Sequence, residues 1–585
     1  MKKLLCLLLT LLLAGCGGEP LSYPDETPSA GTVAYVPLDD RPVNSDRAVY
    51  LAQSLGYEIL LPDQDLYHTC LDGQERNRSG TGYGDRGALW QWVAEQDAAG
   101  CDLFILSLDQ LLSGGLVSSR SMTGYDPILF SDGTTLSEEE AVERFLLPLC
   151  ADSANRIYLL DTVMRLAPTV GYDGFDLAGY EALRSYGMAE RPALSGRLLT
   201  IDNIVDTYPL SAQSGTVPIP DGLREGAVED YLKARERKLR LIAFVLDATE
   251  EKENVRFLIG VDDSAPSASI QTNELSFLRQ AVEGRGAVLS GADEIGMLSL
   301  CRMYEDVTYK GRLPAVRVRY FGGSEESASS DYDHQPLTQI VDAHLDYLGL
   351  AQVPDDSADL QVLVLTAPAD ASRSGSYCSE LIRALRENEK NGVPTALMDA
   401  AKNAYGTSFQ SKLVKEANLG SLLGYAGFYD LANATGITLA NAVARWLCLS
   451  LGDSRSAAQE KAFVRTLTDS LIKDICYKND AKIAITQYVK GELGGDPDNF
   501  AKTGTDLDAV LPQLNSYLDG ACADLILNLN HSNLITSLSP YETAGLRGIG
   551  IGAVTLPWQR VFELRMELSV GTFVAPHRKV LFFYT

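Results

Sequence analysis

VAYVPLDDRPVN, residues 33–44, is the stretch that decides the fold class. Its first four residues are β-branched, aromatic or small, which favours a buried strand. Pro42 disfavours helix at Arg41 and keeps the polar residues extended or in a turn. Open α/β sheets and α/β barrels present active-site groups in this way, at the carboxyl ends of their strands. The alternative interpretation is an Arg–Asp pair that only fixes the loop.

The same arrangement recurs in the first half of the chain. Acidic residues end or follow apolar runs at 102–109, 157–162, 255–261 and 286–290, each of which predicts a strand. Helical patterns separate these runs, so parallel βαβ units are predicted. We therefore expect an α/β protein whose residues 32–310 form a (β/α) barrel-like catalytic domain. A doubly wound sheet is the competing architecture.

A second set of strands begins after residue 310. Apolar runs predict strands at 315–323, 360–366, 394–400 and 422–427. Residues 311–450 are thus typical of a smaller Rossmann- or flavodoxin-like α/β domain. They contain neither GxGxxG nor GxxxxGK[ST], so a phosphate-cradling loop is not indicated. Residues 451–585 are expected to form a mostly helical C-terminal region that packs back on the core.

The N-terminus is typical of a bacterial lipoprotein. Two lysines precede an apolar run over residues 4–14, which is too short to span a bilayer. LAGC, residues 13–16, resembles the lipoprotein box, which implies cleavage before Cys16 and a lipid on its sulfur. We expect a signal peptide at 1–15 and a lipid-anchored flexible tether at 16–31. The protein would then lie at the cell membrane, facing the extracellular or periplasmic side.

The charge balance excludes several classes of partner. Net charge is −28, with 78 acidic and 50 basic residues, whereas nucleic-acid binders usually show the opposite balance. Acidity also opposes adhesion to anionic lipid headgroups, so we expect membrane contact through the N-terminal lipid only. The cysteines are widely spread and form no CxxC pair, which excludes a sequence-local zinc ribbon.

Several further motifs carry a family resemblance. They are SLDQLLSGGLVSSR (107–120), GVDDSAP (260–266), GADE (291–294), LLGYAGFYDLANATG (422–436) and LPWQRVFE (556–563). Together with VPLDDRPVN (36–44), they make the chain resemble an uncharacterised bacterial family, domain of unknown function 4127. The resemblance spans nearly the whole mature chain and implies no established activity. Relatives tend to have Trp-Asn-Thr at 428–430, so no direct ligand role is expected for these three residues.

The acids at the predicted strand ends favour an enzyme that cleaves carbohydrate. Parallel strands place their carboxyl ends on one face, so these acids are expected to converge on one pocket. Glycoside cleavage needs one carboxylic acid as proton donor and one carboxylate as base, nucleophile or stabiliser. Asp262, Asp263 and Glu274 are the catalytic candidates, and the first two also resemble the paired acids of hexosaminidases that act on N-acetylated sugars. The substrate-binding candidates are Asp39, Asp40, Arg41, Asn44, Asp109, Arg120, Asp161, Asp293 and Glu294.

Two alternative functions use the same residues. A metal-dependent hydrolase or deacetylase of cell-surface glycans would hold Mg²⁺ or Ca²⁺ between the clustered acids. The five histidines show neither HxxxH nor HExxH spacing, so no zinc site is assigned. A non-enzymatic solute-binding lipoprotein would need only two α/β domains around a cleft. No cofactor is predicted, and a divalent cation is the alternative to that prediction.

Overall fold

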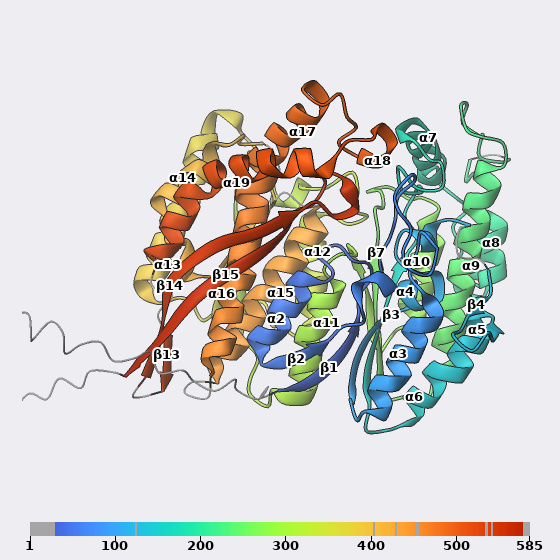
Figure 1. The fold of residues 1–585 in the computed structure, drawn as a ribbon, viewed down its shortest axis with the longest axis horizontal. Helices are drawn as coiled ribbons and strands as arrows, with labels where there is room; N and C mark the ends of the chain where they lie inside the picture. Colours follow the sequence, from blue (N-terminus) through green and yellow to red (C-terminus); the bar gives the residue numbers. More distant parts are fainter. Residues whose placement is uncertain are drawn as a thin grey trace, which may run out of the picture.

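The computed structural model describes residues 30–576 except 123–125, 214, 402–403, 428–429, 452–454, 533–535 and 540–541. The expected signal peptide and lipidated Cys16 lie outside the described residues, as do Phe428 and Tyr429. Two parallel sheets, an antiparallel sheet and a small two-stranded ribbon are covered by helices (Figure 1). This architecture confirms the predicted α/β class.

The first parallel sheet comes from the N-terminal half. Its strands are β1 (Gly31–Val36), β2 (Tyr57–Leu60), β3 (Leu103–Ser107), β6 (Arg156–Val163), β7 (Val255–Val261) and β8 (Gly286–Ser290). Their order is β2-β1-β3-β6-β7-β8, and every neighbouring pair is parallel. The barrel-like expectation is not confirmed, because β2 and β8 stand at opposite edges and do not pair within the described part of the chain. The order is that of an open, doubly wound sheet, and it reverses beside β1.

Helices cover both faces of this sheet (Figure 1). On one side lie α3 (Arg86–Ala98), α4 (Leu108–Ser113), α9 (Ala227–Ala248) and α10 (Gln271–Ala281), and on the other α2 (Asp46–Leu55) and α11 (Ile295–Met303). Strand β1 shows why both faces are covered. Ala34 and Val36 belong to the core beside α3 and α9, whereas Val33 and Tyr35 belong to the core beside α2 and α11. A strand buried on both faces reads as a continuous apolar run.

The second parallel sheet follows after a short connection. It contains β9 (Val316–Phe321), β10 (Leu360–Leu365), β11 (Thr395–Asp399) and β12 (Leu422–Gly427), in the order β12-β11-β10-β9. Its helices are α12 (Leu337–Tyr347), α13 (Ser374–Asn391), α14 (Ser408–Glu416) and α15 (Leu431–Ser450). One hydrophobic core runs from Tyr35 in the first sheet through Ala440 in α15 to Val364 in the second. The two sheets therefore pack against shared helices.

The C-terminal region is helical only in its first part. Helix α16 (Ala457–Leu471), a π-helix (Ile472–Ala481), α17 (Lys482–Gly491), α18 (Phe500–Thr503) and α19 (Leu507–Asn530) are followed by β13 (Thr536–Ser539), β14 (Glu542–Thr555) and β15 (Arg565–Pro576). These last strands form an antiparallel sheet, and β14 alternates glycine with larger residues from Gly548 to Gly552. Period-two patterns suit strands, so this alternation is the signal that the helical expectation missed.

Asp399, at the end of β11, makes stability depend on pH. Its carboxylate is 2% exposed and accepts hydrogen bonds from the Ala401 amide (3.1 Å) and Gln410 Nε2 (2.7 Å). Burial raises the pKa of Asp399 to about 7, against about 3.9 in an unfolded chain. Between these values the folded state binds more protons, so the free energy of unfolding should fall as pH rises from about 4 to about 7.

Asp399→Asn should remove this loss and make the protein more stable than the parent at pH 8. The new amide can donate to Gln410 Oε1, which is buried without a hydrogen-bond partner. Urea unfolding at pH 5, 6.5 and 8 measures the effect. Asp524→Asn, at an exposed position of α19, is the control. An unchanged pH slope in Asp399→Asn would contradict the argument.

Candidate functional site

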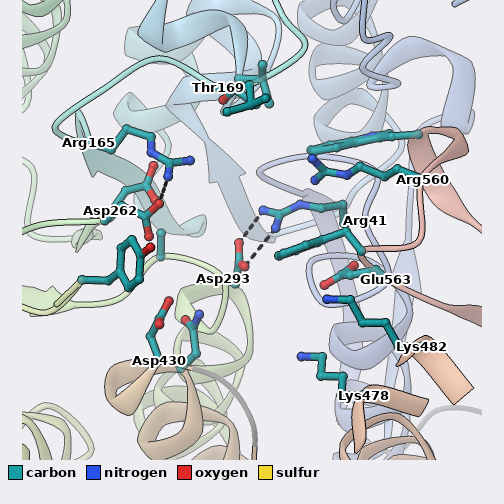
Figure 2. A pocket seen from close by; sticks show the side chains of 18 of the residues that line it. Arg41, Arg165, Thr169, Asp262, Asp293, Asp430, Lys478, Lys482, Arg560 and Glu563 are labelled. Carbon is teal, nitrogen blue, oxygen red and sulfur yellow. Dashed lines mark hydrogen bonds and ion pairs between the residues drawn. The ribbon is translucent and has the colours of Figure 1, made fainter. Parts of the chain in front are cut away.

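A cavity of about 1140 Å³ lies at the carboxyl ends of the first sheet. One side is formed by residues that follow β1, β3, β6, β7 and β8, and the other by α15, α17 and the segment 558–563 (Figure 2). Open α/β sheets bind ligands outside the carboxyl ends of their strands, next to the point where strand order reverses. That point lies between β1 and β3 here, so the cavity stands where this fold class places its ligands.

The loop after β1 brings Arg41 to the cavity between two aspartates. Arg41 donates from Nε to Asp39 Oδ2 (2.8 Å), and from Nη1 and Nη2 to the two oxygens of Asp293 (3.0 and 2.5 Å). Asn44 Nδ2 also donates a hydrogen bond to Asp39 Oδ1 at 2.8 Å. Burial alone would lower the pKa of Arg41, but Asp293 and Asp39 outweigh it and raise that pKa well above its usual value. Arg41 is therefore a fixed, charged guanidinium.

The adjacent acid, Asp40, holds the C-terminal segment in place. Asp40 is 1% exposed and accepts hydrogen bonds from Trp558 Nε1 (2.8 Å) and the Thr69 amide (3.2 Å). His68 Nδ1 lies 2.6 Å from its other oxygen. Burial opposes protonation of His68, but the bond to Asp40 raises the pKa of His68 to about 10, so this pair is charged at neutral pH. Asp40 is thus a supporting residue behind the cavity.

The segment 556–563 turns sharply to enter the site. Trp558 and Gln559 have φ values of 55° and 45°, in the left-handed region that residues other than glycine rarely adopt. The indole ring of Trp558 contacts two guanidinium groups, with Arg41 Cζ 5.2 Å and Arg560 Cζ 4.5 Å from its centroid. The turn places Arg560 and Glu563 on the cavity surface. Strained backbone of this kind tends to persist at functional sites.

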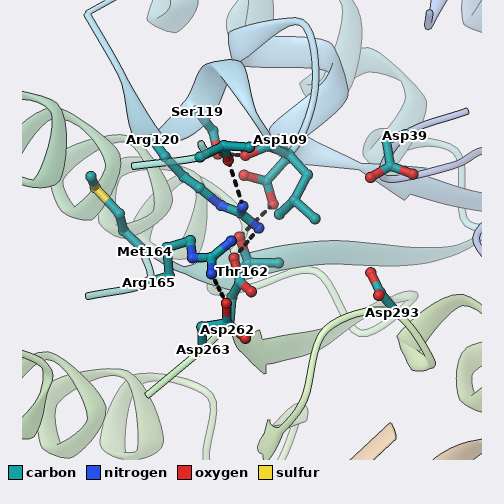
Figure 3. A network of polar contacts seen from close by, with 12 residues as sticks. Asp39, Asp109, Ser119, Arg120, Thr162, Met164, Arg165, Asp262, Asp263 and Asp293 are labelled. Atoms are coloured by element: carbon teal, nitrogen blue, oxygen red, sulfur yellow. Dashed lines mark hydrogen bonds and ion pairs between the residues drawn. The ribbon is translucent and has the colours of Figure 1, made fainter. Parts of the chain in front are cut away.

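Asp262 and Asp263 follow β7 and reach the cavity as ion pairs. Asp262 pairs with Arg120, which follows β3, and Asp263 pairs with Arg165, which follows β6 (Figure 3). Burial lowers the pKa of Arg120 to about 10 even with Asp262 beside it. Asp263 has a φ of 24°, so its backbone is also in the left-handed half of the map. Each carboxylate is therefore oriented by its own guanidinium.

The predicted glycine pair helps to bring Arg120 to this place. Gly114 (φ 79°) ends α4 and Gly115 (φ 134°) continues the bend, which only glycine adopts without strain. The chain then turns so that Arg120 Nη1 donates to Thr169 Oγ1 at 3.2 Å. The bend is the reason that a residue thirteen positions beyond β3 lines the cavity.

Four predicted site residues lie in buried contacts elsewhere. Glu274 pairs with Arg235 at 2.8 Å and accepts from Tyr208 at 2.6 Å. Asp109 and Asp161 share Lys238, and Glu294 lies 3.6 Å from His344. Their carboxylates point into layers between strands and helices, where they serve the packing of the first sheet. Arg41, Arg120, Asp262, Asp263 and Asp293 are the predicted residues that line the cavity, and Asp39, Asp40 and Asn44 support them.

The opposite side of the cavity was missed by the sequence analysis. It carries Lys478, Lys482, Lys490, Arg560 and Glu563, which we call the C-terminal wall. Two signals were available: the lysines recur at multiples of four residues, and LPWQRVFE was recognised only as a motif. Asp430 also lines the cavity, although no ligand role was expected for it.

Within the described ranges, no group of three or more His, Cys, Asp or Glu side chains is placed to hold a metal ion. Among the helices of those same ranges, none is both long enough and apolar enough to cross a bilayer.

Comparison with known proteins identifies the family of the chain but no activity. The model of the family DUF4127, described as a protein of unknown function, matches residues 33–567, so the chain belongs to that family. No curated protein and no solved structure matches the chain.

Proposed function

We propose that this member of the DUF4127 family is a hydrolase that cleaves a carbohydrate in the cavity. The observation that carries the proposal is that acidic and basic side chains from several strands meet in one cavity. Three Arg–Asp pairs, Arg41–Asp293, Arg120–Asp262 and Arg165–Asp263, come from segments that follow five strands of one parallel sheet, and all three line one cavity. As further parts of the proposal, the mature chain carries a lipid on Cys16 and acts outside the cell membrane.

The lining suits a hydroxyl-rich ligand. Fixed carboxylates accept hydrogen bonds from hydroxyl groups, and fixed guanidinium groups donate to ring and hydroxyl oxygens. Tyr180, Tyr332, Trp558 and Phe562 also line the cavity and add apolar surface beside its charged groups. Its volume of about 1140 Å³ is slightly above the range typical of small-molecule pockets, which gives room for more than one sugar ring.

Asp263 is the preferred residue for the chemical step. Its side chain is 21% exposed, more than those of Asp262 (11%) and Asp293 (16%), so it is the most accessible of the three paired acids. The ion pair with Arg165 holds the carboxylate of Asp263 in a fixed orientation, which suits a base or nucleophile. Glycosidases place a second carboxyl group across the scissile bond. We assign that role to Glu563, which lines the same cavity from the C-terminal wall.

Asp262→Asn and Asp263→Asn test the proposal. We expect kcat for glycoside cleavage to fall by about 10²–10⁴-fold in Asp263→Asn, with a smaller loss in Asp262→Asn. Release of reducing ends from a panel of glycosides, including N-acetylated ones, measures activity, and urea unfolding checks the fold. Asp173→Asn is the matched control, since Asp173 is exposed and also has a positive φ of 58°. Full activity in both cavity variants would refute the assignment.

Solute binding without cleavage is the second candidate. It is favoured by the observation that each of the three paired acids already has its own guanidinium partner, an arrangement complete in itself. Calorimetric binding of a sugar that is recovered intact after long incubation would support this candidate over the hydrolase. Activity that disappears on chelation would instead favour a metal-dependent hydrolase.

A further inference from the structure

The C-terminal wall carries more positive charge than its acids balance. Arg560 and Lys482 both line the cavity and are half-buried, and neither forms an ion pair with any residue that the structure describes. The whole cavity is lined by more basic than acidic side chains, although the chain as a whole has a net charge of −28. A local excess of cations in an acidic protein indicates a site for a negatively charged ligand.

Aromatic rings fix the positions of these two cations. Arg560 Cζ lies 4.5 Å from the ring centroid of Trp558 and 4.7 Å from that of Phe562, and Lys482 Nζ lies 5.0 Å from Phe562. Such contacts orient a cation without neutralising it. Figure 2 shows Arg560, Lys482 and Lys478 on one side of the cavity, across from Asp262 and Arg165. The two charges are therefore held toward the cavity in a defined arrangement.

The electrostatic environment agrees with this geometry. Burial and the nearby Arg41 together lower the pKa of Arg560 to about 10, although Glu563 opposes both. Burial also lowers the pKa of Lys482, opposed by Asp498 and assisted by Arg560. Burial lowers the pKa of Lys478 to about 8. The charged forms of these side chains are thus incompletely stabilised, and an anion bound among them would supply the missing stabilisation.

We propose that the C-terminal wall binds an oxyanion group on the substrate, so that the carbohydrate cleaved in this cavity is an acidic one. The anion is a carboxylate, sulfate or phosphate attached to a sugar ring. Arg560 can donate two parallel hydrogen bonds to such a group, and Lys482 adds a point charge. This inference rests on the proposed function for the reaction, but the binding of an acidic sugar does not require cleavage.

Calorimetry with matched sugars tests the anion site. The probes are methyl glucuronide, glucose 6-sulfate and glucose 6-phosphate, each compared with methyl glucoside at low salt. We expect at least one acidic sugar to bind about 10- to 100-fold more tightly than the neutral one, with an advantage that shrinks as salt is added. The acidic probe with the highest affinity identifies which oxyanion is recognised.

Substitutions locate the anion. Arg560→Gln and Lys482→Gln should abolish most of the preference for the acidic sugar, measured as the ratio of its affinity to that of methyl glucoside. Lys415→Gln, at an exposed position of α14, changes the net charge by the same amount and should leave the preference for the acidic sugar unaffected. If Arg560→Gln does not fold, competition by inorganic sulfate or phosphate against the acidic sugar in the unmodified protein gives the same test.

The outcomes separate this inference from the hydrolase proposal. Equal affinity for acidic and neutral sugars, or an acidic preference that survives both substitutions, would overturn the inference. Cleavage of neutral glycosides with no dependence on Arg560 would overturn it too, and would leave the hydrolase standing. Tight, Arg560-dependent binding of an acidic sugar that is never cleaved would support the anion site and reject the hydrolase.

Discussion

Replacement of Arg41 by glutamine is expected to lower the free energy of unfolding by about 3–5 kcal/mol. Asp39 is fully buried and Asp293 is held in the cavity surface, and Arg41 is the shared partner of both carboxylates. Glutamine cannot supply a charge, so two carboxylates would remain with no cation between them. The cost is that of leaving buried charges unpaired, which exceeds the value of the pair itself. Urea unfolding at pH 7 measures the change.

Two further variants decide whether the charge is the cause. In the Arg41→Gln background, Asp293→Asn removes one of the stranded carboxylates and should recover part of the lost stability. Arg41→Lys keeps the charge but cannot contact Asp39 and both oxygens of Asp293 at once, so an intermediate loss is expected. A loss below about 1 kcal/mol for Arg41→Gln would show that water reaches and solvates the pair, as at exposed ion pairs.

Lys238→Met is expected to have an effect of similar size, about 3–5 kcal/mol at pH 8. Lys238, on α9, contacts Asp109 and Asp161 in the layer between that helix and the first sheet, and all three side chains are buried. Burial alone would lower the pKa of Lys238, but the two carboxylates raise it. Methionine has a similar shape and no charge, so it leaves two neighbouring carboxylates without a cation.

The pH dependence of this variant provides a check on the mechanism. Burial raises the pKa of Asp161 to about 7 in spite of Lys238. Because the folded carboxyl holds its proton above the unfolded pKa of about 3.9, stability falls as pH rises through this window, and removal of Lys238 should steepen the fall. The defect of Lys238→Met should therefore shrink at pH 5. Asp109→Asn with Asp161→Asn in the same background should recover most of the loss at pH 8, and a defect independent of pH would contradict the argument.

The individual strands could be predicted from sequence, but whether they form an open sheet or close into a barrel could not. The runs at 255–261 and 286–290 are strands as predicted. A barrel and an open sheet are built from the same βαβ units. They differ only in whether the first and last strands pair, and no residue of β2 or β8 carries a local signal for that long-range choice.

The site was predictable on one side only. Acids after a parallel strand lie near one another, which is why Asp262, Asp263 and Asp293 were predicted to share a pocket, and all three line the cavity. The same rule cannot tell whether a carboxylate faces the cavity or the helix layer, as Asp109 and Asp161 do beside Lys238. The C-terminal wall comes from residues hundreds of positions away, and nothing in the pattern of α17 or the segment 556–563 says which cavity they border.

The hydrogen bond from Trp558 Nε1 to Asp40 joins the loop after β1 to the segment that precedes β15. Arg565, at the start of β15, adds a second connection by donating to the backbone oxygen of Asp40 at 2.7 Å. A chain that is still being synthesised has its acid-bearing strands long before it has the indole and the cations that complete the cavity. The cavity is thus complete only when the segment 556–563 is in place, and a protease that cuts just before residue 556 would separate Arg560 and Glu563 from the three lysines of the C-terminal wall.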